Sequence, residues 1–344
     1  MERGVPPMRD DIIMLGHGSG GKMTSDLLSK VILPALYAGG EIPELEDCAQ
    51  LPLPAGNICF TTDSYVVDPF IFPGGDIGDL AVNGTINDLA MGGARPLYIS
   101  VGFVLEEGLS IEDFRVALRS MNRAARDAGV RIACGDTKVV PRGRGDKIFI
   151  NTSGIGMARS GVSISSGNAA HGDRMIINGS IADHGIAIMS VREGLRFDSP
   201  VVSDTAALHT LVDALFDAGV DIHVMRDPTR GGLATVAAEI AESAGVGIRL
   251  DERAIPMTPA VSGACEVLGL DPMYVANEGK MIILTPERDA QKALDVMRSH
   301  PLGKAAAVIG EVYATDRPKV TVTSSVGGTR IVNKLPGELL PRIC

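Results

Sequence analysis

The sequence predicts two domains, each built from mixed α-helices and β-strands. The chain has 344 residues, and a single hydrophobic core rarely grows beyond about 250 to 300 residues. Along most of the chain, apolar residues alternate between a strand-like period of two and a helical period of three to four. Residues 160–173 are rich in Gly, Ser and Asn, which is typical of a linker between two such halves.

The first half has the pattern of alternating strands and helices. We expect strands at 57–62 and 97–104, and helices at 76–91 and 111–128. Two further strands are expected at 130–140 and 147–157. The turn Pro141-Arg142-Gly143-Arg144-Gly145 between them favours a hairpin.

The second half again mixes the two kinds of element. Strands are expected at 174–178, 247–250, 280–284, 306–313 and 319–322, and helices at 186–192, 204–217, 233–244 and 286–299. The final KLPGELLPRIC has two prolines and no periodicity, which predicts an extended tail. We therefore predict domains over 1–165 and 166–331, and a mobile tail over 332–344.

Composition excludes several classes of protein. Hydrophobic residues at 45% and charged residues at 22% are typical of a globular chain. No apolar run approaches the roughly 18 residues needed to cross a bilayer, so no membrane span is expected. The net charge of −10 and the absence of a basic stripe argue against binding to nucleic acid. The five cysteines form no C-x-x-C pair and no apolar leader is visible, so we expect a cytoplasmic protein.

A glycine-rich segment near the N-terminus, Gly16-His17-Gly18-Ser19-Gly20-Gly21-Lys22, is a candidate phosphate-binding loop. It fits the spacing of a dinucleotide-binding loop, but the preceding strand is short and no acidic residue ends a following strand. It also fits most of a P-loop, but Met23 stands where a metal-binding hydroxyl is required. Converging backbone N–H groups and the charge of Lys22 still favour an anion. The alternative is a plain flexible loop.

Acidic residues recur after the first strand. Asp63 ends that strand, and Asp76, Asp79, Asn83 and Asp88 follow at helical spacing, which lines them along one face. Hard oxygen ligands of this kind suit Mg²⁺ holding a nucleotide. The alternative is that some of these acids are helix N-caps or solvated helix residues. For Asp76, which follows Pro73-Gly74-Gly75, a helix N-cap is the favoured explanation, and for Asp63 and Asp88 both explanations stay open.

Three further charged positions have both a functional and a structural explanation. Asp136 and Lys138 lie two residues apart on one face of a predicted strand. They are either a metal-binding carboxylate with a catalytic lysine beside it, or a salt bridge at the end of the strand. Arg230 lies in Asp227-Pro228-Thr229-Arg230-Gly231-Gly232, which is either an anion site or an ordinary helix start. Glu278, in a turn before a buried strand, is a candidate base or a solvated turn residue.

The last residue, Cys344, is a single nucleophile at the tip of the predicted tail. It is not a prenylation signal, which needs its cysteine four places from the end. An incidental thiol is the common explanation, and a carrier arm is the alternative. The roughly 12 residues after Ile331 reach at most about 40 Å. Arg342 favours the thiolate and the terminal carboxylate opposes it, so the sequence leaves the state of the thiol open.

Taken together, these segments resemble the HypE family, the carbamoyl dehydratases of [NiFe]-hydrogenase maturation. The resemblance runs along essentially the whole chain, through GHGSGGK, TTDSYVVDPFIFPGGDIGDLAVNGTINDLAMGGARP, ACGDTKVV, ADHGIAIMSVREGL, MRDPTRGGLAT, VANEGK and the terminal PRIC. It implies a PurM-like fold, as in aminoimidazole ribonucleotide synthetase and selenophosphate synthetase. The N-terminal domain would contribute strands to a β-barrel across a homodimer, followed by an α+β C-terminal domain.

The resemblance also implies a function and a set of roles. A carbamoyltransferase, HypF, would load a carbamoyl group onto Cys344, ATP would drive its dehydration to a thiocyanate, and the cyanide would pass to iron on a HypC–HypD scaffold. Asp63, Asp88 and Asp136 would hold Mg²⁺ and the phosphates. The loop from Gly16 to Lys22 and Arg230 would bind phosphate, Lys138 would stabilise negative charge, and Glu278 would be the base.

Two other functions remain as alternatives. The first is a small-molecule kinase or synthetase of the same superfamily, making selenophosphate or a thiamine phosphate. Selenium chemistry there would need a cysteine near the glycine loop, and no cysteine precedes Cys48. The second is a non-enzymatic carrier that only displays Cys344. ATP hydrolysis that depends on a loaded cysteine separates the enzyme from the carrier.

Overall fold

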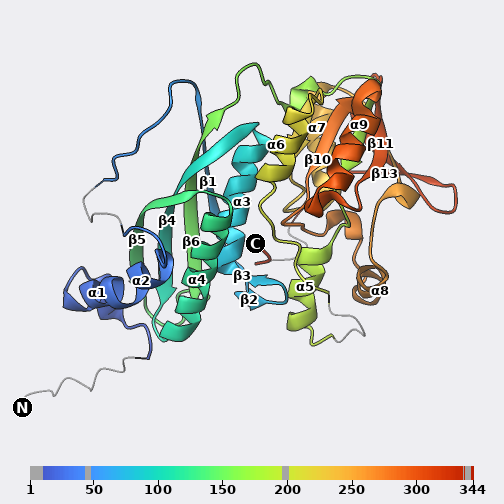
Figure 1. The fold of residues 1–344 in the computed structure, drawn as a ribbon. Helices are drawn as coiled ribbons and strands as arrows, with labels where there is room; N and C mark the ends of the chain where they lie inside the picture. The colour runs from blue at the N-terminus through green and yellow to red at the C-terminus, as the bar shows by residue number, and fades with distance from the viewer. Residues whose placement is uncertain (1–10, 43–47, 196–200, 336, 338–341) are drawn as a thin grey trace, which may run out of the picture.

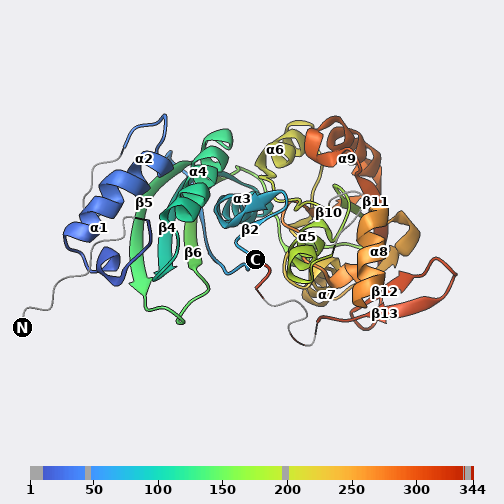
Figure 2. The same ribbon diagram turned by 90° about the horizontal axis from the view of Figure 1, so that it is seen from below.

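The computed structural model describes residues 11–42, 48–195, 201–335, 337 and 342–344. Two lobes lie side by side, and the C-terminus lies between them (Figures 1 and 2). In the described ranges no helix is both long and apolar enough to cross a bilayer.

The N-terminal lobe is a four-stranded sheet with helices on one face. Its strands are β1 (Ile58–Tyr65), β4 (Ala94–Glu106), β5 (Arg131–Val140) and β6 (Ile148–Ala158), in the order β1-β6-β4-β5. The covering helices are α3 (Ile77–Met91) and α4 (Ile111–Asp127). The short helices α1 (Lys22–Leu27) and α2 (Leu33–Leu36), joined by a π-helical turn at Leu28–Ile32, lie beside α4, and a small hairpin, β2 (Ile71–Phe72) with β3 (Gly75–Asp76), precedes α3.

The predicted hairpin of residues 130–140 with 147–157 is wrong. Both strands form, but β6 pairs antiparallel with β4 and β1, while β5 pairs only with β4, in parallel. The crossover through α4 places β5 on the outer edge of β4. The central strand β4, with buried Ile99, Val101 and Phe103, then takes β6 on its other side.

Helix α3 is buried along nearly its whole length, and Asp88 alone among its residues is not fully buried. Asp76 caps its N-terminus by accepting from the N–H groups of Gly78 and Asp79, which confirms the N-cap interpretation of Asp76. Gly78 allows α4 to approach closely, because a Cβ there would lie 2.1 Å from the carbonyl oxygen of Ala117. The opposite face of the sheet carries exposed apolar side chains, among them Ile58 and Phe60.

The C-terminal lobe is a seven-stranded sheet in the order β13-β12-β9-β11-β7-β10-β8, with helices on both faces. The strands are β7 (Asp173–Ile177), β8 (Val224–Arg226), β9 (Gly247–Asp251), β10 (Ile282–Pro286), β11 (Ala307–Tyr313), β12 (Lys319–Thr323) and β13 (Thr329–Val332). The helices are α5 (Asp183–Arg192), α6 (His209–Asp217), α7 (Gly232–Ala244), α8 (Pro259–Leu268) and α9 (Glu287–Ser299). Alternate side chains of β7 enter two separate cores, Met175 and Ile177 on one side and Ile176 on the other.

The elements predicted in this lobe are found, with one informative difference. The helix predicted from residue 204 begins at His209. Residues 203–208 instead form an irregular segment whose backbone is hydrogen-bonded to the N-terminal lobe. Among the described strands and α-helices of the second half, β8, α8 and β13 were not predicted.

Two helical glycines provide a matched test of this packing. Gly78→Ala should lower the free energy of unfolding by about 1–3 kcal/mol, because its methyl group would collide with the backbone of α4. Gly263→Ala in α8, where a Cβ would meet nothing within 4 Å, should leave stability unchanged or raise it by up to about 1 kcal/mol. Urea unfolding measures both, and equal effects would contradict the close approach of α3 and α4.

Candidate functional site

The chain ends in the junction between the lobes, against α3 and α5 (Figures 1 and 2). Ile343 is 3% exposed and belongs to the hydrophobic core of the N-terminal lobe. The Asp68 N–H donates to the Arg342 carbonyl at 3.2 Å, and the Arg342 guanidinium pairs with Asp146 at 3.1 Å. The described tip of the predicted extended tail is therefore docked in the protein, because its last apolar side chain has a core to enter. Residues 338–341 lie outside the described residues.

Docking brings the Cys344 thiol beside the carboxyl of Glu278, where each group affects the pKa of the other. Glu278 is 4% exposed, and its Oε1 is buried without a hydrogen-bond partner. Burial, followed by the charges of Asp204 and Asp227, raises the pKa of Glu278 well above its usual value. The solvated-turn explanation of Glu278 is wrong, since the carboxyl lies inside the junction.

The thiol is neutral in this position. Burial raises the pKa of Cys344 well above that of an ordinary thiol, the charge of Glu278 raises it further, and Arg230 opposes them. Arg230, which the sequence did not connect with the thiol, is therefore a cation that favours the thiolate.

Three carboxyl groups lie beside this pair. Thr61 donates to Asp88 Oδ2 at 2.7 Å, Ser64 N–H donates to Asp63 Oδ1 at 2.8 Å, and Arg230 lies 4.0 Å from Asp63 Oδ1. Burial, with the nearby charge of Asp88, raises the pKa of Asp227 to about 7. We call this group, Asp63, Asp88, Arg230, Glu278 and Cys344 with Asp227, the tail site. A cavity of about 590 Å³ borders it, lined by Ser64, Arg230, Thr235, Tyr274 and Cys344.

The predicted metal ligands only partly come together. Among the described residues, no three His, Cys, Asp or Glu side chains already converge as a ready metal-binding set. The charge of Asp63 nevertheless helps to raise the pKa of Asp88, and the charges of Asp88 and Asp63 help to raise the pKa of Asp227. Carboxylate oxygens that repel one another in this way suit a hard divalent cation. This donor set fits Mg²⁺. Asp227, which precedes Arg230 by three residues, was not recognised in the sequence as part of it.

Asp136 does not join Asp63 and Asp88 within one chain. It lies on β5, three strand spacings from β1, which is about 14 Å. Asp136 is in register with Gly102, on the sheet face opposite α3, whereas Asp63 shares the α3 side with Thr61. Lys138 pairs with Asp136 at 2.9 Å, and their side chains are 64% and 70% exposed, so in this chain the two residues form the salt bridge that was the structural alternative.

The glycine loop lies beside this second pair. Gly18 packs on the backbone of Val139, where a Cβ would approach to 2.6 Å. The Gly20 N–H donates to Thr24 Oγ1 at 2.9 Å, and Lys22 pairs with Asp26 at 2.7 Å. A cavity of about 900 Å³ lies next to the loop, lined in part by Thr24, Leu28, Tyr37, Cys134, Asp136 and Thr137. We call the loop from Gly16 to Lys22, with Asp136 and Lys138, the loop site.

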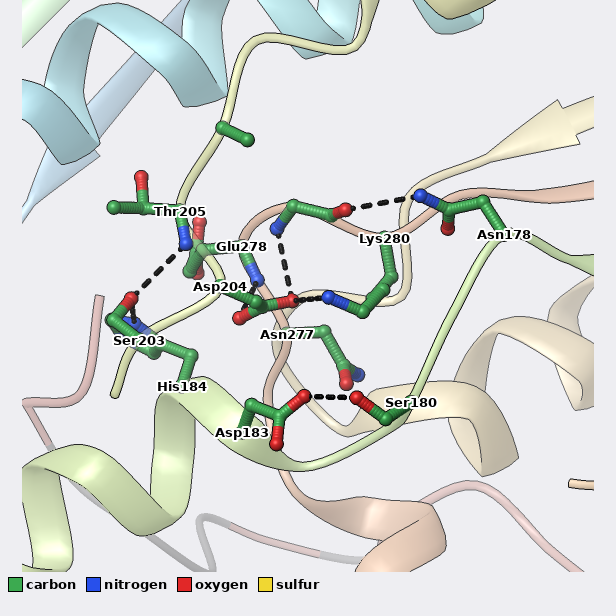
Figure 3. A network of polar contacts seen from close by, with 12 residues as sticks. Asn178, Ser180, Asp183, His184, Ser203, Asp204, Thr205, Asn277, Glu278 and Lys280 are labelled. Atoms are coloured by element: carbon green, nitrogen blue, oxygen red, sulfur yellow. Dashed lines mark hydrogen bonds and ion pairs between the residues drawn. The ribbon is translucent and has the colours of Figure 1, made fainter. Parts of the chain in front are cut away.

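A buried polar network supports the turn that carries Glu278 (Figure 3). Asp204 pairs with Lys280 at 2.9 Å and accepts from the N–H groups of Glu278 and Gly279, each at 3.1 Å. Asn277 Nδ2 donates to the Pro228 carbonyl at 2.7 Å, which joins this turn to the segment with Asp227 and Arg230. Sequence reasoning missed Asp204, because an isolated acidic residue in an irregular segment carries no recognisable signal.

Two family models cover most of the chain. Residues 45–158 match the N-terminal domain, and residues 170–323 the C-terminal domain, of AIR synthase related proteins. With the structural neighbours described below, these matches confirm the predicted two-domain PurM-like fold. The boundary predicted at residue 165 stays a prediction.

The chain is similar to curated proteins along nearly its whole length. The carbamoyl dehydratase HypE of Azotobacter vinelandii is 48% identical over 337 residues, which is 98% of this chain and 98% of that protein. The carbamoyl dehydratase HypE of Rhizobium leguminosarum bv. viciae is 50% identical over 333 residues, which is 96% of this chain and 95% of that protein.

Solved structures agree with these relatives. A structure of hydrogenase maturation protein HypE in complex with ATP superposes with a TM-score of 0.90 at 47% identity, over 96% of this chain and 99% of that chain. A HypE–HypF complex gives a TM-score of 0.78 at 46% identity, over 90% and 99% of the two chains. Thiamine-monophosphate kinase from Stenotrophomonas maltophilia, at 17% identity and a TM-score of 0.64 over 91% of this chain and 92% of that chain, shares the fold.

The contact between Cys344 and Glu278 predicts a pH effect. The Glu278 charge raises the pKa of the thiol, so Glu278→Gln should lower that pKa and move the pH midpoint of Cys344 alkylation to lower pH. Iodoacetamide labelling across a pH series, with the Cys344 peptide quantified by mass spectrometry, measures the midpoint. Glu112→Gln, on the exposed face of α4, is the control. A midpoint that does not move would show that the two groups do not interact.

Proposed function

The chain belongs to the HypE family of carbamoyl dehydratases, and we propose that it converts an S-carbamoyl group on Cys344 into a thiocyanate with hydrolysis of ATP. The family predicted from the sequence is confirmed by relatives that are 48% and 50% identical over nearly the full length. The observation that carries the proposal is the docked thiol of Cys344, held against Glu278 and beside Asp63, Asp88 and Arg230.

The chemistry requires an oxygen to leave. In the proposed reaction the carbamoyl oxygen attacks the γ-phosphorus of ATP and ADP departs. Loss of one N–H proton then gives a C=N bond. Loss of the second, with departure of the oxygen as phosphate, gives S–C≡N. The sum is carbamoyl-thioester plus ATP to thiocyanate, ADP and phosphate, so two protons must be accepted near the sulfur.

Glu278 is the proposed base for these protons. Its unpartnered Oε1 lies in the junction where the cysteine docks, and a carbamoyl nitrogen on the sulfur would supply the missing donor. Its raised pKa makes the ionised carboxylate a stronger base than an exposed glutamate. The carboxyl is positioned by the Asp204 contacts to its own turn.

The remaining residues of the tail site suit the triphosphate. We assign Asp63 and Asp88, together with Asp227, to Mg²⁺, which when bound would neutralise phosphate charge, and Arg230 to a phosphate oxygen. The ATP complex of the HypE relative supports the nucleotide. Asp136, the third metal ligand expected from the sequence, and Lys138 belong to the loop site, so their roles depend on how that site meets the tail site.

A homodimer would bring the two sites together. The face of the sheet opposite α3 exposes Ile58 at 53% and Phe60 at 66%, and an apolar sheet face of this kind is typically covered by another layer. We infer that a second copy covers it, as the expected dimeric barrel requires. The partner subunit's loop, with the partner subunit's Asp136 and the partner subunit's Lys138, would then approach the phosphates held beside Asp63.

The proposed reaction has two transfers, loading of the carbamoyl group and delivery of the cyanide, and each implies a partner. HypF would supply the carbamoyl group, and a solved HypE–HypF complex of a relative supports this. A HypC–HypD scaffold would accept the cyanide on iron. We infer a cytoplasmic location, because the reaction uses ATP and a reduced thiol, and all five cysteines are free.

The alternatives explain less. A kinase of the same fold has no use for a terminal cysteine docked beside a buried carboxyl, and the thiamine-monophosphate kinases at 15% and 17% identity share the fold alone. A carrier that only displays Cys344 would not need its thiol placed beside a buried carboxyl inside the protein.

Intact mass tests the function directly. Incubation with HypF, carbamoyl phosphate and ATP should add one carbamoyl group to Cys344, and this adduct should lose one water with Mg-ATP but not with a non-hydrolysable analogue. Cys344→Ser should show no loss of water. An adduct that never loses water would leave only a carrier, and no adduct at all would reopen the kinase alternative.

Mixed dimers test whether the loop site acts on the partner's tail. Lys138→Ala and Cys344→Ala should each be inactive alone. Coexpressed in equal amounts, they should regain about one quarter of the wild-type rate, because half of the dimers are mixed and each mixed dimer holds one complete pair of sites. If Lys138 acts on the tail of its own chain, the mixture stays inactive. Mixing Cys344→Ala with Glu278→Gln, both in the tail site, is the matched control and should restore nothing.

A further inference from the structure

The tip of the tail is held by its main chain as well as by Cys344. His184 Nε2 lies 2.7 Å from the Ile343 carbonyl oxygen, and His184 is fully buried. A carbonyl only accepts hydrogen bonds, so Nε2 carries the proton of the neutral ring. Nδ1 is then an acceptor, and the Ser203 hydroxyl donates to it, with 2.8 Å between Oγ and Nδ1. The Phe72 ring meets the imidazole edge to face at 5.5 Å, which restricts its orientation.

Ser203 opens an irregular segment, residues 203–208, that we call the interlobe strap. The Ser203 N–H donates to the Pro73 carbonyl at 2.8 Å. Two asparagines of α3 hold the rest: Asn83 donates to Thr205 at 3.2 Å, and Asn87 donates to the Ala206 carbonyl at 3.0 Å. The Leu208 N–H in turn donates to Asn87 Oδ1 at 2.8 Å. Four strap residues are thus attached to the N-terminal lobe, although the strap lies in the second half of the chain.

The next residue of the strap, Asp204, holds the turn with Glu278. Its carboxylate accepts the N–H groups of Glu278 and Gly279 and pairs with Lys280, whose side chain is 11% exposed. The backbone also approaches closely, because a Cβ on Gly279 would lie 1.8 Å from the Asp204 carbonyl oxygen. Two consecutive strap residues therefore contact two different supports of the tail site: Ser203 contacts His184, and Asp204 contacts the turn that carries Glu278 (Figure 3).

We propose that the interlobe strap is a positioning device that joins docking of the tail to placement of the Glu278 carboxyl. Ser203 orients His184, which holds the last peptide carbonyl before Cys344, and Asp204 holds the turn that carries Glu278. His184 and Asp204 are positioning residues that act through Ile343 and Glu278. The inference deepens the proposed function and rests on it for its meaning, but the contacts themselves are tested without the reaction.

The bond from His184 also biases where the tail rests. When the tail leaves, the buried Nε2–H loses its acceptor, and an unpaired donor in a buried site is unfavourable. The hydrogen bond from His184 therefore stabilises the docked tail relative to the undocked tail. Because the bond is to a main-chain carbonyl, it depends on the position of the tail and not on the chemical state of the Cys344 side chain, so a loaded cysteine is held in the same way.

The first test measures tail docking without ATP or partners, as the rate of Cys344 alkylation resolved by peptide mass spectrometry. His184→Phe keeps a ring beside Phe72 but removes both nitrogens, and should raise the rate about five- to tenfold. His184→Gln, whose amide nitrogen takes the place of Nε2, should restore most of the slow rate, and Ser203→Ala should lie between. His223→Phe removes a hydrogen bond between His223 and Asp173 in the same lobe, and its Cys344 should be alkylated at the wild-type rate.

The second test measures dehydration of the carbamoylated chain. Asp204→Asn with Lys280→Met removes the buried ion pair without leaving one charge unpaired, and should slow water loss at least about tenfold while carbamoylation by HypF is kept. Thermal unfolding confirms that each variant is folded.

Two results would overturn the inference: His184→Phe alkylated at the rate of His223→Phe, or the Asp204→Asn and Lys280→Met variant dehydrating at the wild-type rate. If alkylation responds as expected while even the wild type forms no thiocyanate, the role of His184 in docking the tail is confirmed and the proposed function is wrong.

Discussion

The burial of α3 is the constraint on which the rest of the structure depends. A helix enclosed on nearly all sides has no solvent for its polar side chains, so each must find a partner in the protein. Asn83 and Asn87 find theirs in the interlobe strap, and Asp88 finds Thr61 on β1. The polar residues of one helix therefore fix how the second lobe sits on the first, and the junction so formed is where the tail ends.

That junction explains why acidic groups there have unusual properties. Burial raises the pKa of Glu278 and of Asp227, whereas the exposed Asp136, paired with Lys138, has a lowered pKa. Carboxyl groups in this protein therefore differ in proton affinity because their surroundings differ. A buried carboxyl with an unpartnered oxygen is suited to accept a proton. An exposed ion pair on an edge strand can exchange its partner for a phosphate, which is the role that the proposed dimer would give it.

The sequence predicted most elements but not how they pair. Periodicity located α3, α4 and β6, yet it could not show that β6 crosses to the far side of β4, because strand order depends on contacts distant in sequence. Motifs likewise identified Asp63, Arg230 and Glu278, since each lies in a recognisable turn or strand end. Asp204 was beyond such reasoning, because its importance lies entirely in the three donors that the fold brings to it. Its segment even had the composition of a helix, and tertiary hydrogen bonds to α3 overrode that local preference.

The docked tail also imposes an order on the proposed cycle. In the junction the thiol of Cys344 is neutral, since burial and Glu278 raise its pKa, and a neutral thiol is a poor nucleophile. Loading by a transferase needs the thiolate and access from outside, so it belongs to an undocked tail. Dehydration needs the opposite, because a buried site keeps water from the phosphorylated intermediate and places the carbamoyl nitrogen at Glu278. A carbamoylated sulfur has neither a proton nor a charge. The loaded tail can therefore dock without the repulsion that a free Cys344 thiolate would meet at the Glu278 carboxylate. The same burial that makes the docked cysteine unreactive thus favours its loaded form at the site of dehydration.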